Sequence, residues 1–306
     1  MHITGSRSTG FPTFDDLFKY LALLPLIAIL VLLVIMPVGQ LILTSFSRVR
    51  FVSGGIEFSP IGLENYRNAL QDQVAFRALI NTTALAIISV TIETILAVTL
   101  AISVGYVRRG NAIFRTVFIF PMLLPPIAIG VMWLMILDFN YGVLNGVLSF
   151  FGIMGPAWLA HPSLAFPSIV VVDIWHWTSF VFLIVLAGVE TLPHELSESA
   201  RIDGATEGQI IWQIILPLLR PIILVAVITR TIFAFKVYEQ IYLLTDGGPG
   251  NRTEVVSSYI MRVFFNQNRM GYAAALSVLT LIFITLLIGT VYSLQNAFNR
   301  DKEATK

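Results

Sequence analysis

Two apolar stretches of this sequence carry polar and aromatic side chains at helical spacing. Both sets follow the i, i+3, i+4, i+7 pattern that places side chains on one face of a helix. The first set is Asp173, His176, Trp177 and Phe180, and the second is Arg230, Phe233, Ala234 and Val237. Hydrogen-bonding groups beside aromatic rings suit a sugar, whose hydroxyls need donors and acceptors and whose C–H groups pack against rings. We therefore expect the two faces to line a path for a polar solute.

Arg230 is the most informative of these residues, and the sequence leaves two interpretations of it open. It pairs with Asp173, or it holds a carboxylate, sulfonate or phosphate of a solute in bidentate fashion. Glu93 lies in a third apolar stretch, where a carboxylate costs ~2.5–3.5 kcal/mol to insert and should face protein or water. Its partner is a nearby hydroxyl such as Thr91 or Thr94, or it serves the path directly.

The apolar stretches that carry these residues are long enough to cross a membrane. The chain has 306 residues, of which 56% are hydrophobic and only 12% charged, and its mean hydropathy is +0.82. A helical span needs ~20 mostly apolar residues. Six stretches qualify: 21–43, 79–105, 113–137, 166–189, 222–244 and 273–294. The sequence predicts an all-α integral membrane protein, with its third span disturbed by Pro121, Pro125 and Pro126.

Several functional classes are disfavoured by the composition. A net charge of +1 argues against nucleic acid as a partner, and zero cysteines exclude disulfides, thiolate metal sites and a cysteine nucleophile. The histidines are His2, His161, His176 and His194, without metal-ligand or nucleophile–base spacing. No Gly-rich loop is followed by Lys-Ser/Thr, so any ATP must bind elsewhere. We expect no catalytic residues, no metal and no cofactor on this chain, which is not predicted to be an enzyme.

A polar segment separates the fourth and fifth apolar stretches. Pro193 suits the first turn of a helix, and Gly204 permits a tight turn. Thr206 with Gln209 three residues later forms a capping-box pattern that begins a second helix, and Pro217 should disturb the start of the next span. The segment is expected to form a helix–turn–helix that stands out of the membrane, a shape suited to docking.

This segment resembles the "EAA" loop of bacterial ABC-transporter permease subunits. The family's Glu falls on Glu198, its second Ala on Ala200, its Gly on Gly204 and its closing Ile-x-Leu-Pro on 214–217; Ser199 stands where Ala is common. The resemblance implies that the loop inserts into a groove of an ATP-hydrolysing subunit, with Glu198 as anchor, Ala200 and Gly204 permitting close approach and Asp203 holding the turn. The implied coupling residues are Glu198, Ser199, Ala200, Asp203, Gly204 and Ala205.

Shorter motifs are similar to the maltose/glycerol-phosphate type of carbohydrate permease. They are Trp133 followed by Gly-x-Leu-Asn at 142–145, Thr-x-Gly-Gly-Pro at 245–249, and Gly-Tyr-Ala-Ala-Ala at 271–275. Counted from Leu192-Pro193 and from Thr245, the family's sugar-lining positions fall on the two sets of residues described first. The resemblance covers residues 20–298.

The architecture implied by this resemblance is the type I, maltose-permease-like fold of six transmembrane helices with a cytoplasmic coupling helix. Residues 1–19 form an N-terminal tail, 20–298 the permease domain with its coupling loop at 191–221, and 299–306 a C-terminal tail. Lys and Arg are somewhat more frequent on the side of the coupling loop, which places that loop and both termini in the cytoplasm of a bacterium, with the chain in its inner membrane.

The implied function is that of a transmembrane subunit of an ATP-driven importer for a sugar, a polyol or a sugar derivative, including an anionic one. Its implied partners are a second permease subunit, two ATP-binding subunits, and a periplasmic or lipid-anchored solute-binding protein. The alternative is an ion-coupled secondary transporter with a proton relay through Asp173, His176, Glu93 and Glu239. Such transporters typically contain two related halves, and no halves of matching pattern are present here.

Overall fold

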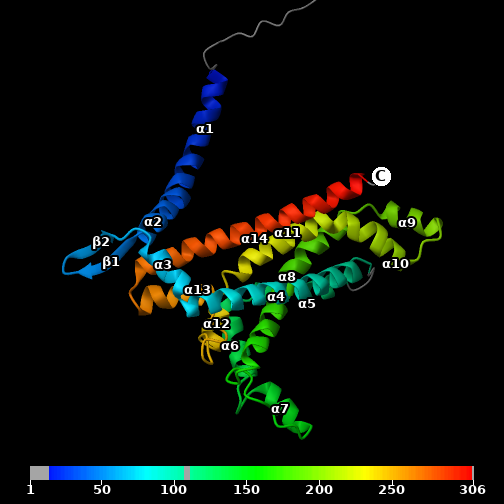
Figure 1. Cartoon of the computed structure of the whole chain (residues 1–306). Helices are drawn as coiled ribbons and strands as arrows, with labels where there is room; N and C mark the ends of the chain where they lie inside the picture. Colours follow the sequence, from blue (N-terminus) through cyan, green and yellow to red (C-terminus); the bar gives the residue numbers. More distant parts are fainter. Residues whose placement is uncertain (1–13, 107–110, 305–306) are drawn as a thin grey trace, which may run out of the picture.

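The computed structural model describes residues 14–106 and 111–304 and is almost entirely helical (Figure 1). Five helices are long and apolar enough to cross a membrane, and a sixth span is formed if a bent pair is counted as one. The unbroken spans are Leu21–Ser45, Gln73–Gly105, Ala165–Glu190, Glu207–Ala234 and Met270–Ser293. The prediction of an all-α membrane protein with six spans is therefore confirmed.

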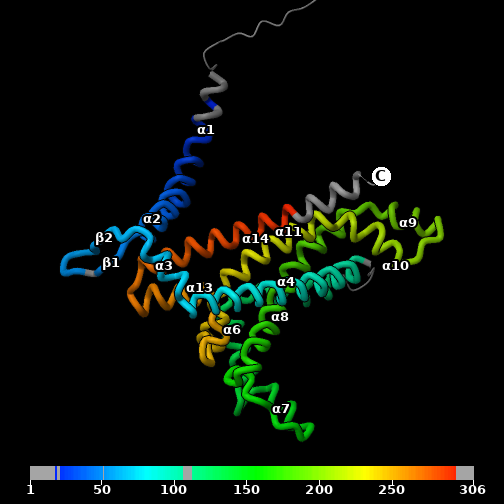
Figure 2. The backbone as a smooth tube through the Cα atoms, in the orientation of Figure 1, coloured from blue at the N-terminus to red at the C-terminus, as the bar shows by residue number. Residues whose placement is uncertain are grey.

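The N-terminal part of the first span stands away from the other helices (Figures 1 and 2). It consists of α1 (Phe14–Leu30), a π-helical turn (Val31–Ile35) and α2 (Met36–Ser45). Residues 21–38 are exposed, and contact with the bundle is made through α2, which packs on α14 (Met270–Ala304). This apolar helix therefore buries little of its surface within the chain itself.

A β-hairpin and a short helix follow the first span. Strand β1 (Ser47–Val52) pairs antiparallel with β2 (Gly55–Pro60), with Ser47 opposite Pro60. The hairpin is followed by α3 (Glu64–Gln71), in which the buried Asn65 amide donates to the carbonyls of Ser45 and Ser47, at 2.9 and 3.1 Å. This side-chain clamp fixes the hairpin against the end of the span.

The centre of the bundle is formed by α4 (Gln73–Tyr106), α8 (Ala165–Glu190) and α11 (Leu216–Ala234). Small residues of α4, such as Ala97 and Ala101, pack in a core with larger residues of α8 and α11. Gly188 of α8 lies so close to α11 that an added Cβ would stand 2.6 Å from Ile222 Cδ1. Without a hydrophobic driving force between helices in lipid, such close packing of small residues supplies much of the attraction.

The third span is broken at its prolines, as the sequence predicted. Helix α5 (Asn111–Ile119) and a 3-10 turn (Phe120–Leu123) lead to Leu124 and Pro125 in extended conformation, and α6 (Pro126–Ile136) then starts in a new direction. The two halves meet at 97°.

The fifth span differs from its prediction, which placed a continuous helix over 222–244. Helix α11 ends at Ala234, and α12 (Glu239–Leu244) begins after four intervening residues. Between them the chain unwinds, and the Ser257 hydroxyl donates to the Val237 carbonyl. A freed carbonyl at membrane depth is tolerated where other parts of the protein satisfy it. The helical face assumed for Arg230 to Val237 therefore ends at Ala234.

The remaining elements lie at the two ends of the bundle (Figure 1). At the end where α14 finishes are α9 (His194–Ile202), α10 (Glu207–Ile210) and a π-helical turn (Ile211–Ile215) that leads into α11. At the opposite end are the hairpin, α3, α7 (Val143–Phe150) and α13 (Val256–Met261), with a π-helical turn (Arg262–Asn266) before α14.

Candidate functional site

A cavity of about 140 Å³ lies where the two interrupted spans meet α8. Its wall includes Pro126 at the start of α6, residues of α8, and the unwound stretch between α11 and α12. The lining residues are Pro126, His176, Trp177, Phe233, Lys236, Val237, Glu239 and Gln240. Interrupted helices expose backbone and side-chain polar groups in the interior of a membrane protein, and such places are where solutes bind in several transporter folds.

Aromatic rings form one wall of this cavity. Trp177 and Phe233 lie with their ring centroids 5.3 Å apart, and Phe180 packs behind both, at 5.8 Å from Trp177 and 5.5 Å from Phe233. The two faces that the sequence predicted to line a path are therefore in contact with each other. The rings offer an apolar surface to the C–H groups of a solute.

A buried ion network lies behind the aromatic wall. The guanidinium of Arg230 donates from Nε to Glu93 Oε2 at 2.7 Å, from Nη2 to Glu93 Oε1 at 3.0 Å, and from Nη2 also to Asp173. All three side chains are 0% exposed. The network ties α4, α8 and α11 together, so it joins the three central helices of the bundle.

This network decides between the two interpretations of Arg230. Pairing with Asp173 is what the structure contains, with Glu93 as a further partner. The guanidinium has no surface with which to hold an anionic solute, because it lies beneath the Trp177 ring with Cζ 4.8 Å from the ring centroid. The hydroxyl partner considered for Glu93 is also not the one found, since the Thr94 hydroxyl donates instead to the Val90 carbonyl of its own helix at 2.6 Å.

Half of the predicted path residues line the cavity. His176, Trp177, Phe233 and Val237 do so. Asp173, Phe180, Arg230 and Ala234 lie outside the lining, and Ala234 is buried beside Phe235 and Ala86.

The sequence missed Pro126, Lys236, Glu239 and Gln240 as lining residues. For Lys236, Glu239 and Gln240 the physical reason is the unwinding of 235–238, which turns these side chains onto a face that a continuous helix would not present, whereas Pro126 reaches the cavity through the break of the third span. The available signal was the presence of three polar side chains among apolar ones at 236–240.

The predicted helix–turn–helix is present at the other functional surface. Helices α9 and α10 form it, and no residue of α9 is buried. Of the predicted coupling residues, Glu198, Ser199, Asp203 and Gly204 are exposed, whereas Ala200 and Ala205 are half-buried against the inner core. The small alanines thus seat the loop on the bundle, and the other residues face outward.

The turn is held by backbone geometry. Gly204 has φ +85°, its N–H donates to the Arg201 carbonyl at 3.1 Å, and the Ala205 N–H donates to the Ala200 carbonyl at 2.9 Å. This is the Schellman arrangement, which favours glycine because an L side chain is strained at positive φ. Among the described residues the Asp203 side chain has no hydrogen-bond partner, so its expected role in holding the turn is not what the structure contains.

Two further features of this segment are the cap at the start of α10 and two exposed apolar side chains. The capping box between Thr206 and Gln209 is present in both directions, which confirms that prediction. Ile202 is 86% exposed and Trp212 75% exposed, and neither was predicted as a contact residue. Large apolar side chains exposed beside a polar loop are typical of a surface that another protein covers.

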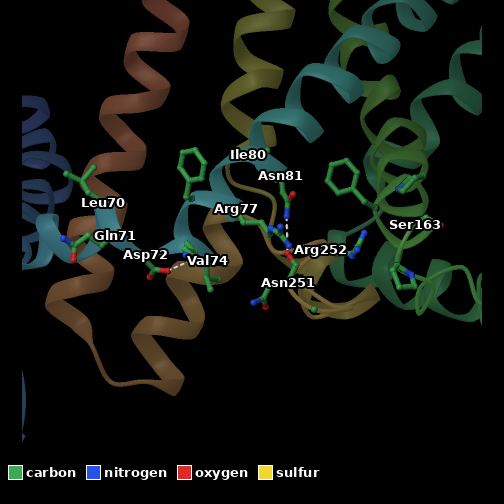
Figure 3. A pocket seen from close by; sticks show the side chains of 16 residues that line it. Leu70, Gln71, Asp72, Val74, Arg77, Ile80, Asn81, Ser163, Asn251 and Arg252 are labelled. Carbon is green, nitrogen blue, oxygen red and sulfur yellow. Dashed lines mark hydrogen bonds between the residues drawn. The ribbon is translucent and has the colours of Figure 1, made fainter.

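A hollow of about 1230 Å³ opens at the opposite end of the bundle (Figure 3). It is bordered by the end of α3 and start of α4, by residues near the start of α8, and by the loop at 250–252. Arg77 and Arg252 contribute positive charge, and Asn81 donates from its amide to the carbonyl of Glu254 at 2.8 Å. The hollow therefore combines charged and amide groups with apolar side chains, and Asn81 joins α4 to the loop on its other side.

Asp72 fixes the edge of this hollow. Its Oδ1 accepts from the N–H groups of Val74 and Ala75 at the start of α4, and its Oδ2 accepts from the hydroxyls of Tyr259 and Tyr272, each at 2.6 Å. Burial acts to raise the pKa of Asp72, but these hydrogen bonds outweigh it and hold the pKa below the usual value. The carboxylate is therefore the stable form at neutral pH, and it joins α4, α13 and α14.

Comparison with known proteins decides the family. Residues 93–302 match the family described as "Binding-protein-dependent transport system inner membrane component". The chain belongs to this family. The permease is 34% identical to the trehalose/maltose transport system permease protein MalF of Thermococcus litoralis, over 92% of this chain and 94% of that protein. It is 33% identical to the sulfoquinovosyl glycerol transport system permease protein SmoG of Agrobacterium fabrum, over 91% and 90%.

The fold of the permease is also that of solved transporters. A bacterial ABC transporter involved in import of the acidic polysaccharide alginate superposes with a TM-score of 0.80 at 24% identity, covering 92% of this chain and 96% of that chain. The predicted type I permease fold is therefore confirmed. Membership of this family also favours an importer subunit of the inner membrane over the ion-coupled secondary transporter considered as the alternative.

Proposed function

We propose that this permease is one of two membrane subunits that together form the path for a sugar, a polyol or a sugar derivative in an ATP-driven importer. The observation that carries the proposal is the cavity between the interrupted spans, in which aromatic rings lie beside polar groups. Its relatives include permeases named for trehalose and maltose, and for sulfoquinovosyl glycerol.

The second permease supplies the missing half of the site. The cavity of about 140 Å³ is smaller than the about 300–1,000 Å³ of typical ligand pockets, so one chain provides one wall of a larger chamber. The exposed first span supports the same partner, because residues 21–38 have an apolar surface that this chain does not cover. The partner subunit and lipid together cover it.

Two ATP-binding subunits serve the permease pair, and one of them receives α9. Glu198 anchors the contact, Ser199, Asp203 and Gly204 lie on the docking surface, and Ile202 adds apolar area. Closure of the ATP-binding subunits moves α9 and, through Ala200 and Ala205, the bundle on which it sits. ATP is hydrolysed on those subunits, and this chain requires no cofactor of its own. Both termini then lie in the cytoplasm with α9.

A periplasmic or lipid-anchored solute-binding protein docks at the hollow on the other end. Arg77 and Arg252 give that surface positive charge, which favours acidic residues on the partner. A solved alginate transporter is in complex with a periplasmic protein bound to an alginate pentasaccharide, which supports this arrangement for a protein of the same fold.

The test is purification from the native host through a tag on this chain, followed by reconstitution in vesicles. We expect two ATP-binding subunits and a second permease to co-purify, and ATP hydrolysis to rise when the binding protein is loaded with one sugar of a panel. The panel contains neutral sugars, polyols and anionic sugars. Uptake that persists without ATP but collapses with the proton gradient would overturn the proposal.

A further inference from the structure

Gln240 is a buried amide in the cavity wall whose side-chain oxygen is unpaired among the described residues. It is 2% exposed, and its Nε2 lies 3.0 Å from Nδ1 of His176. Its Oε1 has no hydrogen-bond partner among the described residues. A buried amide oxygen without a partner costs free energy, and native proteins rarely keep one unless water or a ligand satisfies it.

His176 holds this amide in position. An amide nitrogen can only donate, so Nδ1 of His176 accepts and the ring carries its proton on Nε2. With the amide in the opposite orientation, Nδ1 of His176 would donate to Oε1 and Nε2 would be the atom without a partner, a donor that a solute hydroxyl oxygen also satisfies. His176 lies on α8 and Gln240 on α12, so the contact links the helix that precedes α9 with the segment beyond the break.

The charges around the cavity indicate what kind of solute group this amide meets. Arg230 is enclosed by Glu93 and Asp173 and does not line the cavity. Lys236 and Glu239 line it with opposite charges. The polar group that remains buried in the wall is therefore a neutral acceptor, and its complement is a neutral donor such as a hydroxyl.

We propose that Gln240, oriented by His176, recognises a hydroxyl of the solute. Oε1 of Gln240 accepts a hydrogen bond from the hydroxyl, while the C–H surface of the same sugar ring lies against Trp177 and Phe233. The inference rests on the proposed function and deepens it, because it assigns a residue that selects hydroxylated solutes. Gln240 binds the solute directly, and His176 is a positioning residue.

The experiment uses the reconstituted complex and the sugar of the panel that it carries best, together with monodeoxy derivatives of that sugar. Gln240→Met keeps a side chain of similar length and removes the acceptor. We expect it to raise KM for the parent sugar about three- to ten-fold. For one monodeoxy derivative, the one that lacks the recognised hydroxyl, wild type and Gln240→Met should have the same KM.

Val237→Ala is the matched control, because Val237 lines the same cavity without a side-chain hydrogen bond. Val237→Ala should raise KM for the parent sugar and for every deoxy derivative by the same factor. A Gln240→Met variant that behaves like Val237→Ala, or that unfolds at lower temperature with unchanged KM, would assign Gln240 a structural role and overturn the inference. Its failure is distinct from failure of the proposed function, in which wild type would carry no sugar or polyol at all and both proposals would fall.

Discussion

Replacement of Arg230 tests whether the buried ion network stabilises the bundle or recognises the solute. Arg230→Gln keeps a polar but shorter side chain and removes the positive charge that faces Glu93 and Asp173. Since all three side chains are 0% exposed, water cannot replace the lost partner. We expect the variant to lose stability and to lose uptake of neutral and anionic solutes by the same factor.

The magnitude follows from the burial of the network. Removing one partner of a buried ion pair costs about 3–5 kcal/mol, because the other charge is left without compensation. With a shift of about 2–4 °C per kcal/mol for a chain of roughly this size, the lower bound corresponds to a fall in Tm of the order of 6–12 °C. Protonation of one carboxyl relieves part of this cost, so the lower bound is the expected value.

Thermal unfolding of the purified complex is the assay, with two comparison variants. Arg48 and Glu64 form an ion pair of the same length, 2.7 Å, but are 46% and 47% exposed, so Arg48→Gln should cost less than about 1 kcal/mol. The triple variant Glu93→Gln, Asp173→Asn and Arg230→Gln removes every charge together and should recover most of the lost stability. Equal Tm values for Arg230→Gln and Arg48→Gln, or loss of uptake for anionic solutes alone, would refute the structural role.

Three further predictions concern the coupling turn, the cavity rim and the outer edge. Gly204→Asp should abolish solute-stimulated ATP hydrolysis, because φ +85° costs an L residue about 1–2 kcal/mol and the added carboxylate meets the ATP-binding subunit. The same change at Gly208, which lacks positive φ, should have a milder effect. Lys236→Gln should raise KM about two- to five-fold for anionic sugars and leave neutral sugars unchanged, and equal effects would contradict charge recognition there. The lowered pKa of Asp72 means that its contribution to stability is present above its unfolded pKa of about 3.8 and is lost as the pH falls through the folded value. Asp72→Asn should therefore lower Tm at pH 7, and the difference in Tm from wild type should shrink below about pH 4. A difference in Tm that is independent of pH would contradict this explanation.

Local chemistry was sufficient to predict the membrane class and the helix–turn–helix formed by α9 and α10. Runs of apolar residues near 20 in length specify spans whatever their neighbours are, because lipid requires the backbone to satisfy itself. The turn at Gly204 and the cap from Thr206 to Gln209 depend on residues a few positions apart, so the sequence contains all of their partners. The break at Pro125 likewise follows from the ring of proline itself.

The cavity between the interrupted spans could be predicted only in part, because its shape depends on contacts between distant segments. No proline or glycine lies between 222 and 246, so no local residue predicts that the helix ends at Ala234. The unwound carbonyl of Val237 is satisfied by Ser257, twenty residues further on, which the sequence does not reveal. This break brings Lys236, Glu239 and Gln240 into the wall.

The partners of the charged residues were decided by tertiary structure as well. The sequence identified Arg230, Asp173 and Glu93 as costly in lipid but could not choose between pairing and solute binding. Glu93 is 137 positions from Arg230, and only the packing of α4 against α8 and α11 brings them within 2.7 Å. Residue types and spacing thus determined that these charges must face the protein interior, and helix packing decided which of them meet.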